Sequence, residues 1–350
     1  MVEIDGSYCS GGGQILRTAC ALAVVTKKPC RVFNIRKSRP KPGLATQHLL
    51  GIQALAQLCS GALEGDELGS EEIKFFPGET YRDRVSVKIP TAGSITLVLQ
   101  TLIPPALFAP RPIEISFEGG ATDTFFSPTI DHFRYVFLKI LEKMGGKLEI
   151  EILKRGYYPE GGAKINVKIF PSKLREINLT ERGELKKIAV LSGASEFLRG
   201  KKVAERQTRG VREVFGKLKL PIEEKVEYEQ TQSPGSQICL IAEFKNTVIG
   251  ADNLGKLGER AEDVGKEAAL ELLKEEKSHA CLDKRLADQI LPYMALAPKK
   301  SLVSVSEITN HCKTNIWVIE KFVAGKFKIN PHTNFGVGVK GNLIGWAPKI

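Results

Sequence analysis

The stretch Ser306–Phe322 reads SEITNHCKTNIWVIEKF and places a histidine, His311, directly ahead of an apolar pattern. The apolar side chains recur at the spacing of one face of an α-helix: Ile316, Val318, Ile319 and Phe322. Because Thr309 and Asn310 are polar residues of the kind that cap helices, a helix is predicted to start near His311. Free backbone N–H groups at a helix start attract anions, so His311 is a candidate base, phosphate ligand or nucleophile. The alternative is a surface or capping histidine.

The His311 helix belongs to a strand–helix–strand–helix–strand–strand pattern that occurs three times along the chain. The first helices of the three units align as GGGQILRTACALAVV, AGSITLVLQTLIPPALF and ADQILPYMALA, the second of them interrupted by Pro104-Pro105. The second helices align as PGLATQHLLGIQALAQL, SPTIDHFRYVFLKILEKM and NHCKTNIWVIEKF. Such self-similarity indicates a repeat architecture. We expect an α/β (α+β) fold in which three βαβαββ units form a large domain and offer helix starts to a shared centre.

Residues 182–278 break this pattern. They are predicted to form a small α/β domain inserted before the third unit, with a strand pair at Glu223–Glu229 and Ile238–Phe244. Residues 1–181 and 279–350 then make up the large domain. A basic helix in the insert carries Arg206, Arg209 and Arg212. It is either a nucleic-acid-binding face or a solvated helix with i,i+4 ion pairs.

The chain carries a net charge of +11, from 51 Lys and Arg against 40 Asp and Glu. This excess favours a polyanionic partner such as nucleic acid. A solvated, lysine-rich surface of the thermophile kind is the alternative, because Lys and Glu are both enriched in such proteins.

The seven cysteines are scattered and form no C-x-x-C pair, which supports neither a zinc site nor a disulfide framework. Reduced thiols are typical of a cytoplasmic protein. No apolar run reaches the roughly 20 residues of a membrane span, and the first residues read as a strand rather than a signal peptide. A cytoplasmic location without membrane association is therefore expected.

Five motifs in order carry a resemblance to a known family. They are IDGSYCSGGGQILRTA (4–19), NIRKSRPKPGL (34–44), SITLVLQT (94–101), LADQILPYMALA (286–297) and H-x-x-x-N from His311 to Asn315. Together they resemble the RNA 3′-terminal phosphate cyclases of the archaeal type. The resemblance runs from end to end and includes the place of the insert.

The resemblance implies an enzyme that converts an RNA 3′-terminal phosphate to a 2′,3′-cyclic phosphodiester. It implies ATP and a divalent metal, Mg²⁺ or Mn²⁺, as cofactors, and RNA with a 3′-phosphate end as partner. A homo-oligomer is compatible with the sequence. In this family a histidine attacks the α-phosphorus of ATP to give a histidine–AMP intermediate, and AMP then moves to the RNA 3′-phosphate. His311 matches the position of that catalytic histidine.

The resemblance also implies the binding residues. Pro128 matches a proline that packs on adenine, and Arg285 takes the place of a ring on the opposite face of the base, where a guanidinium can stack. The residues implied for the nucleotide are Gln14, Arg17, Gln100, Pro128, Arg285, Leu286, Ala287, Asp288 and Gln289. Those implied for RNA or ATP phosphates are Arg36, Arg39 and Gln47. Ordinary structural roles are the alternatives, for example a turn proline at Pro128 and a helix cap at Asp288.

One departure concerns the metal. Where the family has Gly-Glu before the three glycines, this chain has Cys9-Ser10, and a hydroxyl is a poorer ligand for a hard cation than a carboxylate. Asp5 or Asp288 could compensate, so the metal ligands stay unassigned. The alternative to the enzyme is a non-catalytic, cyclase-like RNA-binding or ribosome-assembly factor. A relative of the enolpyruvyl transferases, whose repeats are similar, is a third hypothesis.

Overall fold

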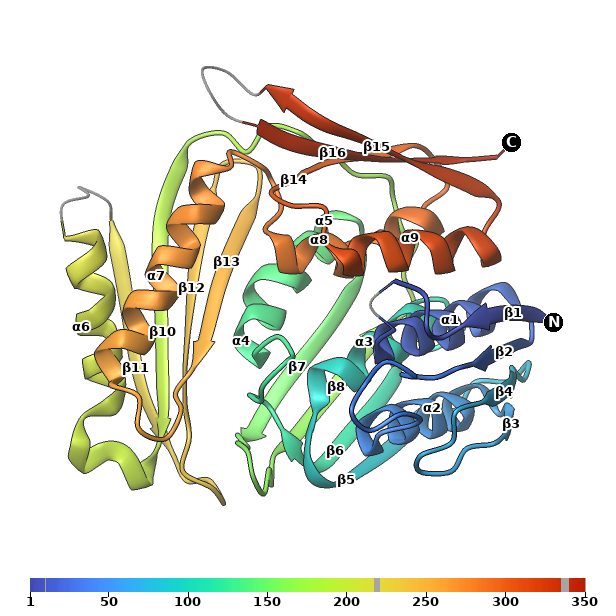
Figure 1. Ribbon diagram of the computed structural model, residues 1–350, viewed down its shortest axis with the longest axis horizontal. Helices are drawn as coiled ribbons and strands as arrows, with labels where there is room; N and C mark the ends of the chain where they lie inside the picture. Colours follow the sequence, from blue (N-terminus) through green and yellow to red (C-terminus); the bar gives the residue numbers. More distant parts are fainter. Residues whose placement is uncertain (10, 217–220, 335–339, 350) are drawn as a thin grey trace.

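The computed structural model describes residues 1–9, 11–216, 221–334 and 340–349. Within these residues it contains four four-stranded mixed sheets and the helices that pack on them (Figure 1). This confirms the predicted α/β (α+β) class. In the same residues, no helix is both long enough and apolar enough to cross a membrane.

Three of the sheets have one topology. The first comprises β1 (Val2–Asp5), α1 (Gly13–Thr26), β2 (Cys30–Phe33), α2 (Thr46–Cys59), β3 (Ala62–Glu64) and β4 (Ile73–Phe76). The second comprises β5 (Arg84–Ser94), α3 (Ile95–Leu107), β6 (Ile113–Ala121), α4 (Ile130–His132), a π-helical turn (Phe133–Phe137), α5 (Leu138–Lys143), β7 (Lys147–Lys154) and β8 (Lys164–Phe170). Their strand orders are β1-β2-β4-β3 and β5-β6-β8-β7. In both sheets the first, second, fourth and third strands of the unit lie side by side in that order.

The third sheet is assembled from two distant parts of the chain. It comprises β9 (Asn178–Leu179), α8 (Lys284–Leu296), β14 (Ser301–Val305), α9 (Asn310–Phe322), β15 (Gly325–Asn334) and β16 (Lys340–Pro348), in the order β9-β14-β16-β15. Since β9 pairs in parallel with β14, residues 182–278 interrupt this unit after its first strand. We expected residues 182–278 to precede the whole third unit in the sequence. A strand of two residues has too short a pattern to be found in the sequence.

The interrupting segment has its own sheet and its own core. It comprises β10 (Leu185–Ser195), a 3₁₀ turn (Glu196–Lys201), α6 (Val203–Phe215), β11 (Ile222–Glu229), β12 (Ser236–Phe244), β13 (Val248–Leu254) and α7 (Ala261–Lys277). Apolar residues of α6, α7 and the sheet, such as Phe215, Leu240 and Leu272, form a cluster separate from the main core. The expected pairing of β11 with β12 is wrong, because β10 lies between them, and β13 was not anticipated.

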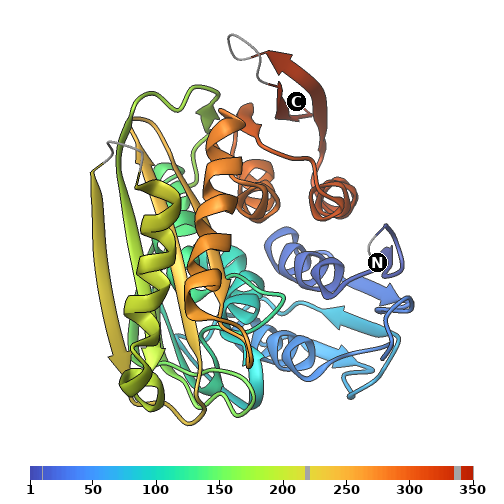
Figure 2. The ribbon, with the colours of Figure 1, turned by 60° about the vertical axis from the view of Figure 1, so that its left-hand side comes forward.

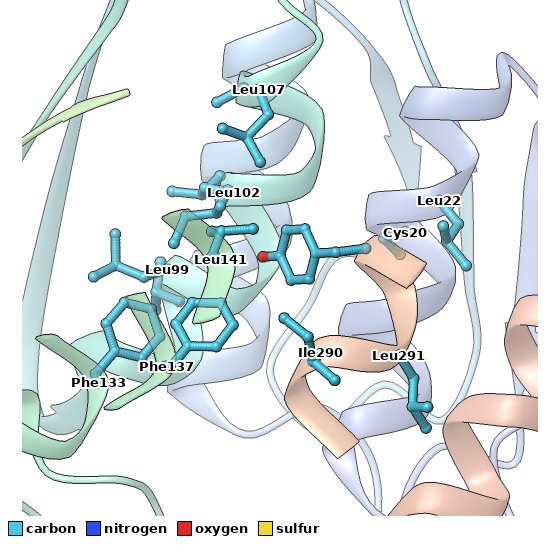
Figure 3. Packing of buried hydrophobic residues seen from close by; sticks show 14 of the residues in the cluster. Cys20, Leu22, Leu99, Leu102, Leu107, Phe133, Phe137, Leu141, Ile290 and Leu291 are labelled. Carbon is cyan, nitrogen blue, oxygen red and sulfur yellow. The ribbon is translucent and has the colours of Figure 1, made fainter. Parts of the chain in front are cut away.

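The helices of the three units pack against one another between their sheets (Figures 1 and 2). Figure 3 shows the packing, with side chains from α1, α3, the π-helical turn, α5 and α8 meeting in one cluster. The helix α3 runs through Pro104 and Pro105 without the interruption that these residues predict. Because α1, α3, α8 and α9 come from all three units, polar residues on them can share one site.

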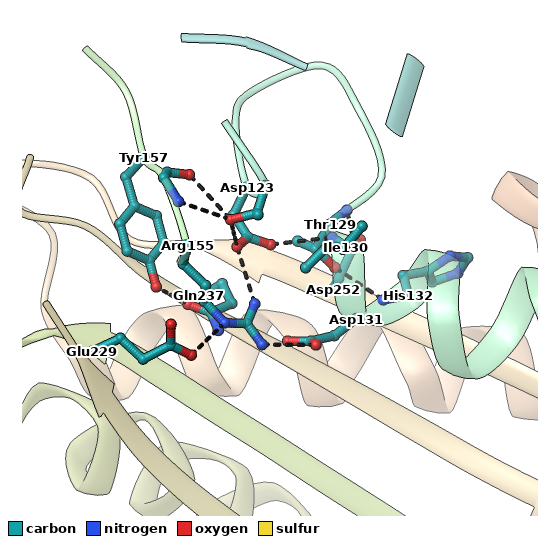
Figure 4. Close-up of polar contacts among 12 residues, drawn as sticks. Asp123, Thr129, Ile130, Asp131, His132, Arg155, Tyr157, Glu229, Gln237 and Asp252 are labelled. Carbon is teal, nitrogen blue, oxygen red and sulfur yellow. Dashed lines mark hydrogen bonds and ion pairs between the residues drawn. The ribbon is translucent and has the colours of Figure 1, made fainter. Parts of the chain in front are cut away.

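A buried ionic network joins the inserted domain to the second unit (Figure 4). Arg155 follows β7, and its side chain is 7% exposed. Its Nη1 donates to Asp123 Oδ2 at 3.1 Å, its Nη2 to Asp131 Oδ1 at 2.8 Å, and its Nε to Glu229 Oε1 at 3.0 Å. Glu229 ends β11 of the insert. One guanidinium therefore binds carboxylates of both domains.

Candidate functional site

The helix that carries His311 begins as predicted. Thr309 is its N-cap, with Oγ1 accepting a hydrogen bond from Cys312 N at 3.1 Å. His311 is the second residue of α9 and is exposed, whereas Val318 and Ile319, about two turns further along the helix, are buried. The imidazole therefore lies at the open, N-terminal end of a helix that is anchored by its apolar side.

A second capped helix start lies nearby, on α8. Asp283 Oδ1 accepts hydrogen bonds from Arg285 N at 3.0 Å and Leu286 N at 2.8 Å. This cap fixes the first turn of α8, so that Asp288 and Gln289 project one turn further along. Leu286 and Ala287, both predicted at the nucleotide, have buried side chains in the main core, so only their backbone atoms could reach a ligand.

Five of the predicted nucleotide-binding residues meet in one group, in which two hydrogen-bonded sets are linked by the charges of Arg17 and Asp288. Gln14 Nε2 donates to Asp288 Oδ2 at 2.5 Å. Arg17 Nη2 donates to Gln100 Oε1 at 3.3 Å, and Gln100 Nε2 donates to Gln289 Oε1 at 3.2 Å. These residues come from α1, α3 and α8. The site is thus built where all three units contact each other.

Asn315 ties α9 to this group. Its Nδ2 donates to Asp288 O at 2.8 Å, and its Oδ1 accepts from Thr18 Oγ1 at 2.7 Å. Asn315 is buried, so it holds the helix rather than facing a ligand. The H-x-x-x-N spacing signals Asn315 in the sequence, whereas nothing in the sequence points to Thr18.

Burial sets the charge states of the group. It lowers the pKa of Arg17 to about 10, although the negative charge of Asp288 acts to raise that pKa. It also raises the pKa of Asp288 to about 7, which the positive charge of Arg17 partly opposes. The pKa of His311 is lowered, first by desolvation and then by Arg17 and Arg39. At neutral pH His311 is therefore an uncharged imidazole with a free nitrogen lone pair.

The start of α1 presents polar atoms without protein partners. In the part of the chain that the structure describes, Gln14 Oε1, Arg17 Nε and His48 Nδ1 are buried and lack hydrogen-bond partners. Buried polar atoms normally have partners. The Arg17 guanidinium can donate to an anionic ligand, whereas Gln14 Oε1 accepts hydrogen bonds and needs a donor. Arg17 and the N-terminus of α1 therefore fit an anion such as a phosphate. His48 was not among the residues predicted from the sequence. Burial, together with the charges of Arg17 and Arg36, lowers the pKa of His48 to about 3, so its side chain is neutral at neutral pH.

Gly13 is required by this arrangement. A Cβ on Gly13 would lie 2.1 Å from atoms of the His48 ring, which is itself buried. We expect Gly13→Ala to displace His48 and to lower the free energy of unfolding by about 1–3 kcal/mol. Gly200→Ala is the matched control, because a Cβ there would meet nothing within 4 Å. Chemical denaturation of both variants checks this, and equal stabilities would contradict it.

The residues available for a divalent metal are few. Among the described residues no group of three or more His, Cys, Asp or Glu is placed to hold one. Asp5 Oδ1 accepts hydrogen bonds from Ser7 in its own turn and from Asn34 just after β2, whereas Asp288 is the carboxylate beside Arg17. Mg²⁺ often takes one or two carboxylates plus substrate phosphates, so Asp288 fits such a metal. Ser10, the other position of interest, lies outside the described residues.

Pro128 and Arg285 are brought together by a residue of the insert. Asp252 on β13 forms an ion pair with Arg285, and its Oδ2 accepts a hydrogen bond from Thr129 N at 2.8 Å. Pro128 is next to Thr129, and its carbonyl accepts a hydrogen bond from Thr96 Oγ1 at 2.9 Å. The two residues predicted to face a purine thus lie around one buried carboxylate, which the sequence did not indicate.

The residues predicted to hold phosphates have different surroundings. Arg36 Nη1 donates to Gly43 O at 2.8 Å, and Gln47 Oε1 accepts from Ser94 N at 3.1 Å. Arg39 approaches the glycine loop, since its Nη2 would lie 3.5 Å from a Cβ on Gly12. Gln47 therefore holds the start of α3 in place, whereas the Arg39 side chain lies close enough to the start of α1 to contact an anion bound there.

The arginines of α6 are paired with carboxylates. Arg206 Nη2 lies 2.7 Å from Glu262 Oε2, Arg212 Nη2 lies 2.5 Å from Glu224 Oε2, and Arg209 Nη1 lies 4.0 Å from Glu262 Oε1. The partners lie on α7 and β11, so these are not the predicted i,i+4 pairs. Of the two interpretations of this helix, the pairing still favours a solvated helix over a nucleic-acid-binding face.

The fold and the site define an α/β protein of repeated units whose helices bring buried polar residues together beside a neutral histidine. Comparison with known proteins gives the family. A family model described as "RNA 3'-terminal phosphate cyclase" matches residues 8–329, and the chain belongs to this family.

Curated proteins with the same description are similar over nearly the whole chain. One from Pyrococcus furiosus is 43% identical over 344 residues, covering 98% of both chains. One from Pyrococcus abyssi is 44% identical and covers 94% of this chain and 95% of its own. One from Pyrobaculum aerophilum is 43% identical and covers 93% of this chain and 94% of its own. The predicted resemblance is confirmed.

Proposed function

We propose that this protein converts an RNA 3′-terminal phosphate to a 2′,3′-cyclic phosphodiester at the expense of ATP. The family and the names of its similar archaeal relatives support the reaction class. The observation that carries the proposal for this chain is His311, uncharged at neutral pH, at the capped start of α9 and beside Arg17 and Arg39. A non-catalytic relative would have no need of such a group.

The chemistry follows from the substrate. A 3′-phosphate has no good leaving group, so it must be activated before the 2′-hydroxyl can attack it. A lone pair on the His311 ring attacks the α-phosphorus of ATP, forming a P–N bond and breaking the P–O bond to pyrophosphate. An RNA 3′-phosphate oxygen then takes the AMP and releases the histidine. Finally the 2′-hydroxyl attacks the activated phosphate, loses its proton and expels AMP, a step favoured by proximity.

The residues of the site divide these tasks. Arg17 and the backbone N–H groups of the α1 start would neutralise the phosphates of ATP, with Gln14 and Gln100 fixing Arg17 and Asp288 in place. Pro128 and Arg285 would enclose the base. Arg36 and Arg39 lie in the basic loop that would hold the RNA end. A divalent metal beside Asp288 would shield phosphate charge.

Two labels test the proposal. ATP labelled on the α-phosphate should leave acid-labile, alkali-stable label on the protein, and an RNA with a labelled 3′-phosphate should become resistant to phosphatase. Absence of protein-bound label with Mg²⁺ and with Mn²⁺, while RNA still binds, would instead identify a non-catalytic RNA-binding protein.

The pKa of His311 predicts the pH dependence of the first step. Because only the neutral ring attacks, and its pKa lies below the usual 6.5, adduct formation should persist as pH falls through that value. Arg39→Gln removes a positive charge that lowers this pKa, so the acid limb of the rate should move to higher pH. Single-turnover labelling without RNA, from about pH 5 to about pH 8, measures the shift.

Arg111→Gln is the control for this experiment. Arg111 is a surface residue paired with Asp83, and its side chain is 66% exposed. Its loss should leave the acid limb where it is in the unaltered protein. If Arg39→Gln also left the limb unmoved, Arg39 would not influence His311.

A further inference from the structure

Tyr8 and Trp317 form a parallel aromatic stack beside the glycine loop. Their ring centroids are 4.3 Å apart and the ring planes differ by 11°. Trp317 is half-buried against the main core, whereas Tyr8 is 40% exposed. Since Trp317 covers one face of the Tyr8 ring, a ligand could stack only on the opposite face.

The stack is held by the same elements as the site. Tyr8 N donates to Asp5 O at 3.3 Å and Tyr8 O accepts from Gly11 N at 3.0 Å, so a turn fixes its backbone. Trp317 is on α9, six residues after His311, which corresponds to about 9 Å along the helix axis. Lys321, one turn further, places its Nζ 5.6 Å from the Trp317 ring centroid. The stack is therefore attached to the same helix as the histidine, less than two turns from it.

A strongly basic loop adjoins this stack. Residues 36–41, RKSRPK, contain four cationic side chains and no acidic one. The loop touches the glycine loop, because a Cβ on Gly11 would lie 2.7 Å from Ser38 Oγ. The positive excess of the chain belongs to the large domain, which carries this loop: residues 182–278 have 18 Lys and Arg against 17 Asp and Glu, and the rest has 33 against 23.

We propose that Tyr8, backed by Trp317, is a stacking platform for a nucleobase near the 3′ end of the RNA. This rests on the proposed function, which brings an RNA end to His311. An aromatic face beside a basic groove is how proteins hold single strands without reading their sequence, because every base offers a π-face. The platform would therefore bind the last few nucleotides and tolerate any base.

A purely structural role for the stack is the competing explanation, so the test uses substrate and protein changes together. The substrates are RNAs that end in a 3′-phosphate and carry one abasic nucleotide, placed at the last, second-last or third-last position. Tyr8→Ala should raise the KM for intact RNA roughly 5- to 100-fold, as expected for one stacked base. Tyr8→Phe should behave like the unaltered protein. Phe197→Ala, which removes an aromatic ring that is 66% exposed in the insert, is the control and should change nothing.

The outcomes separate the alternatives. With the unaltered protein, one abasic position should raise the KM by a similar factor, and that effect should disappear in Tyr8→Ala. If instead the rise in KM from the abasic position and the rise from Tyr8→Ala multiplied, Tyr8 would not contact that base, and the proposal would be wrong. A slower formation of protein-bound label from ATP alone in Tyr8→Ala would show that the ring only supports the loop. If the unaltered protein proved inactive, the same comparison made by RNA-binding affinity would still decide on the platform.

Discussion

His311→Ala is expected to abolish the transfer of label from the α-phosphate of ATP to the protein, with a loss of at least about 1000-fold. The reason is that alanine has no nucleophilic atom, and the polar groups around Arg17 can only bind and orient the nucleotide. Cyclisation of 3′-phosphorylated RNA should be lost to the same extent. Both are measured in single-turnover reactions with and without RNA.

The fold should survive this change. His311 is exposed at the start of α9, and the contacts that anchor the helix are made by Asn315 and the apolar face. We therefore expect a change of less than about 0.5 kcal/mol in the free energy of unfolding. His279→Asn is the matched control, because His279 is also exposed and asparagine tolerates its positive φ of 54°. Normal labelling in His311→Ala would show that another residue is the nucleophile.

Local patterns were sufficient for most of the fold. The apolar spacing and the Thr309 cap predict α9, and the recurrence of the same pattern led to the α/β class. What the sequence did not disclose depends on long-range pairing. β9 is only two residues long and exists because β14 pairs with it, and the place of β10 between β11 and β12 has no local signal. Pro104 and Pro105 stay helical inside the buried α3, where packing outweighs propensity.

The site was less accessible to local reasoning. Gln14 and Asp288 are 274 positions apart, and no periodicity relates them. Their common place followed only from the resemblance of several motifs taken together. His48 and Asp252 were missed because each has an ordinary local context: one is a helical histidine and the other lies in a strand of the insert. Only the packing shows that His48 contacts Gly13 and that Asp252 pairs with Arg285.

The network around Arg155 joins the two domains through buried charges. Its partners Asp123 and Asp131 have side chains that are 0% and 3% exposed, and burial raises the pKa of Asp123 although Arg155 opposes this. Two carboxylates so close together remain charged only while the guanidinium lies between them. The pairing itself is no proof of a net gain, because desolvation offsets much of the attraction. Removing Arg155, however, leaves Asp123 and Asp131 buried without their opposite charge.

Arg155→Met is therefore expected to lower the free energy of unfolding by about 3–5 kcal/mol at neutral pH. Arg84→Met is the control, since Arg84 pairs with Glu114 on the surface, with side chains 85% and 47% exposed, and should cost less than about 1 kcal/mol. Burial already raises the native pKa of Asp123 above its ordinary value, and the loss of the guanidinium in Arg155→Met raises it further, so the native state of the variant binds more protons than the unfolded state. Stability of the variant then falls as pH rises through the carboxylate range, and the deficit should shrink in acid. Denaturation near pH 5 and near pH 7.5 measures this, and an equal deficit at both would show that lost packing, not unpaired charge, causes the destabilisation.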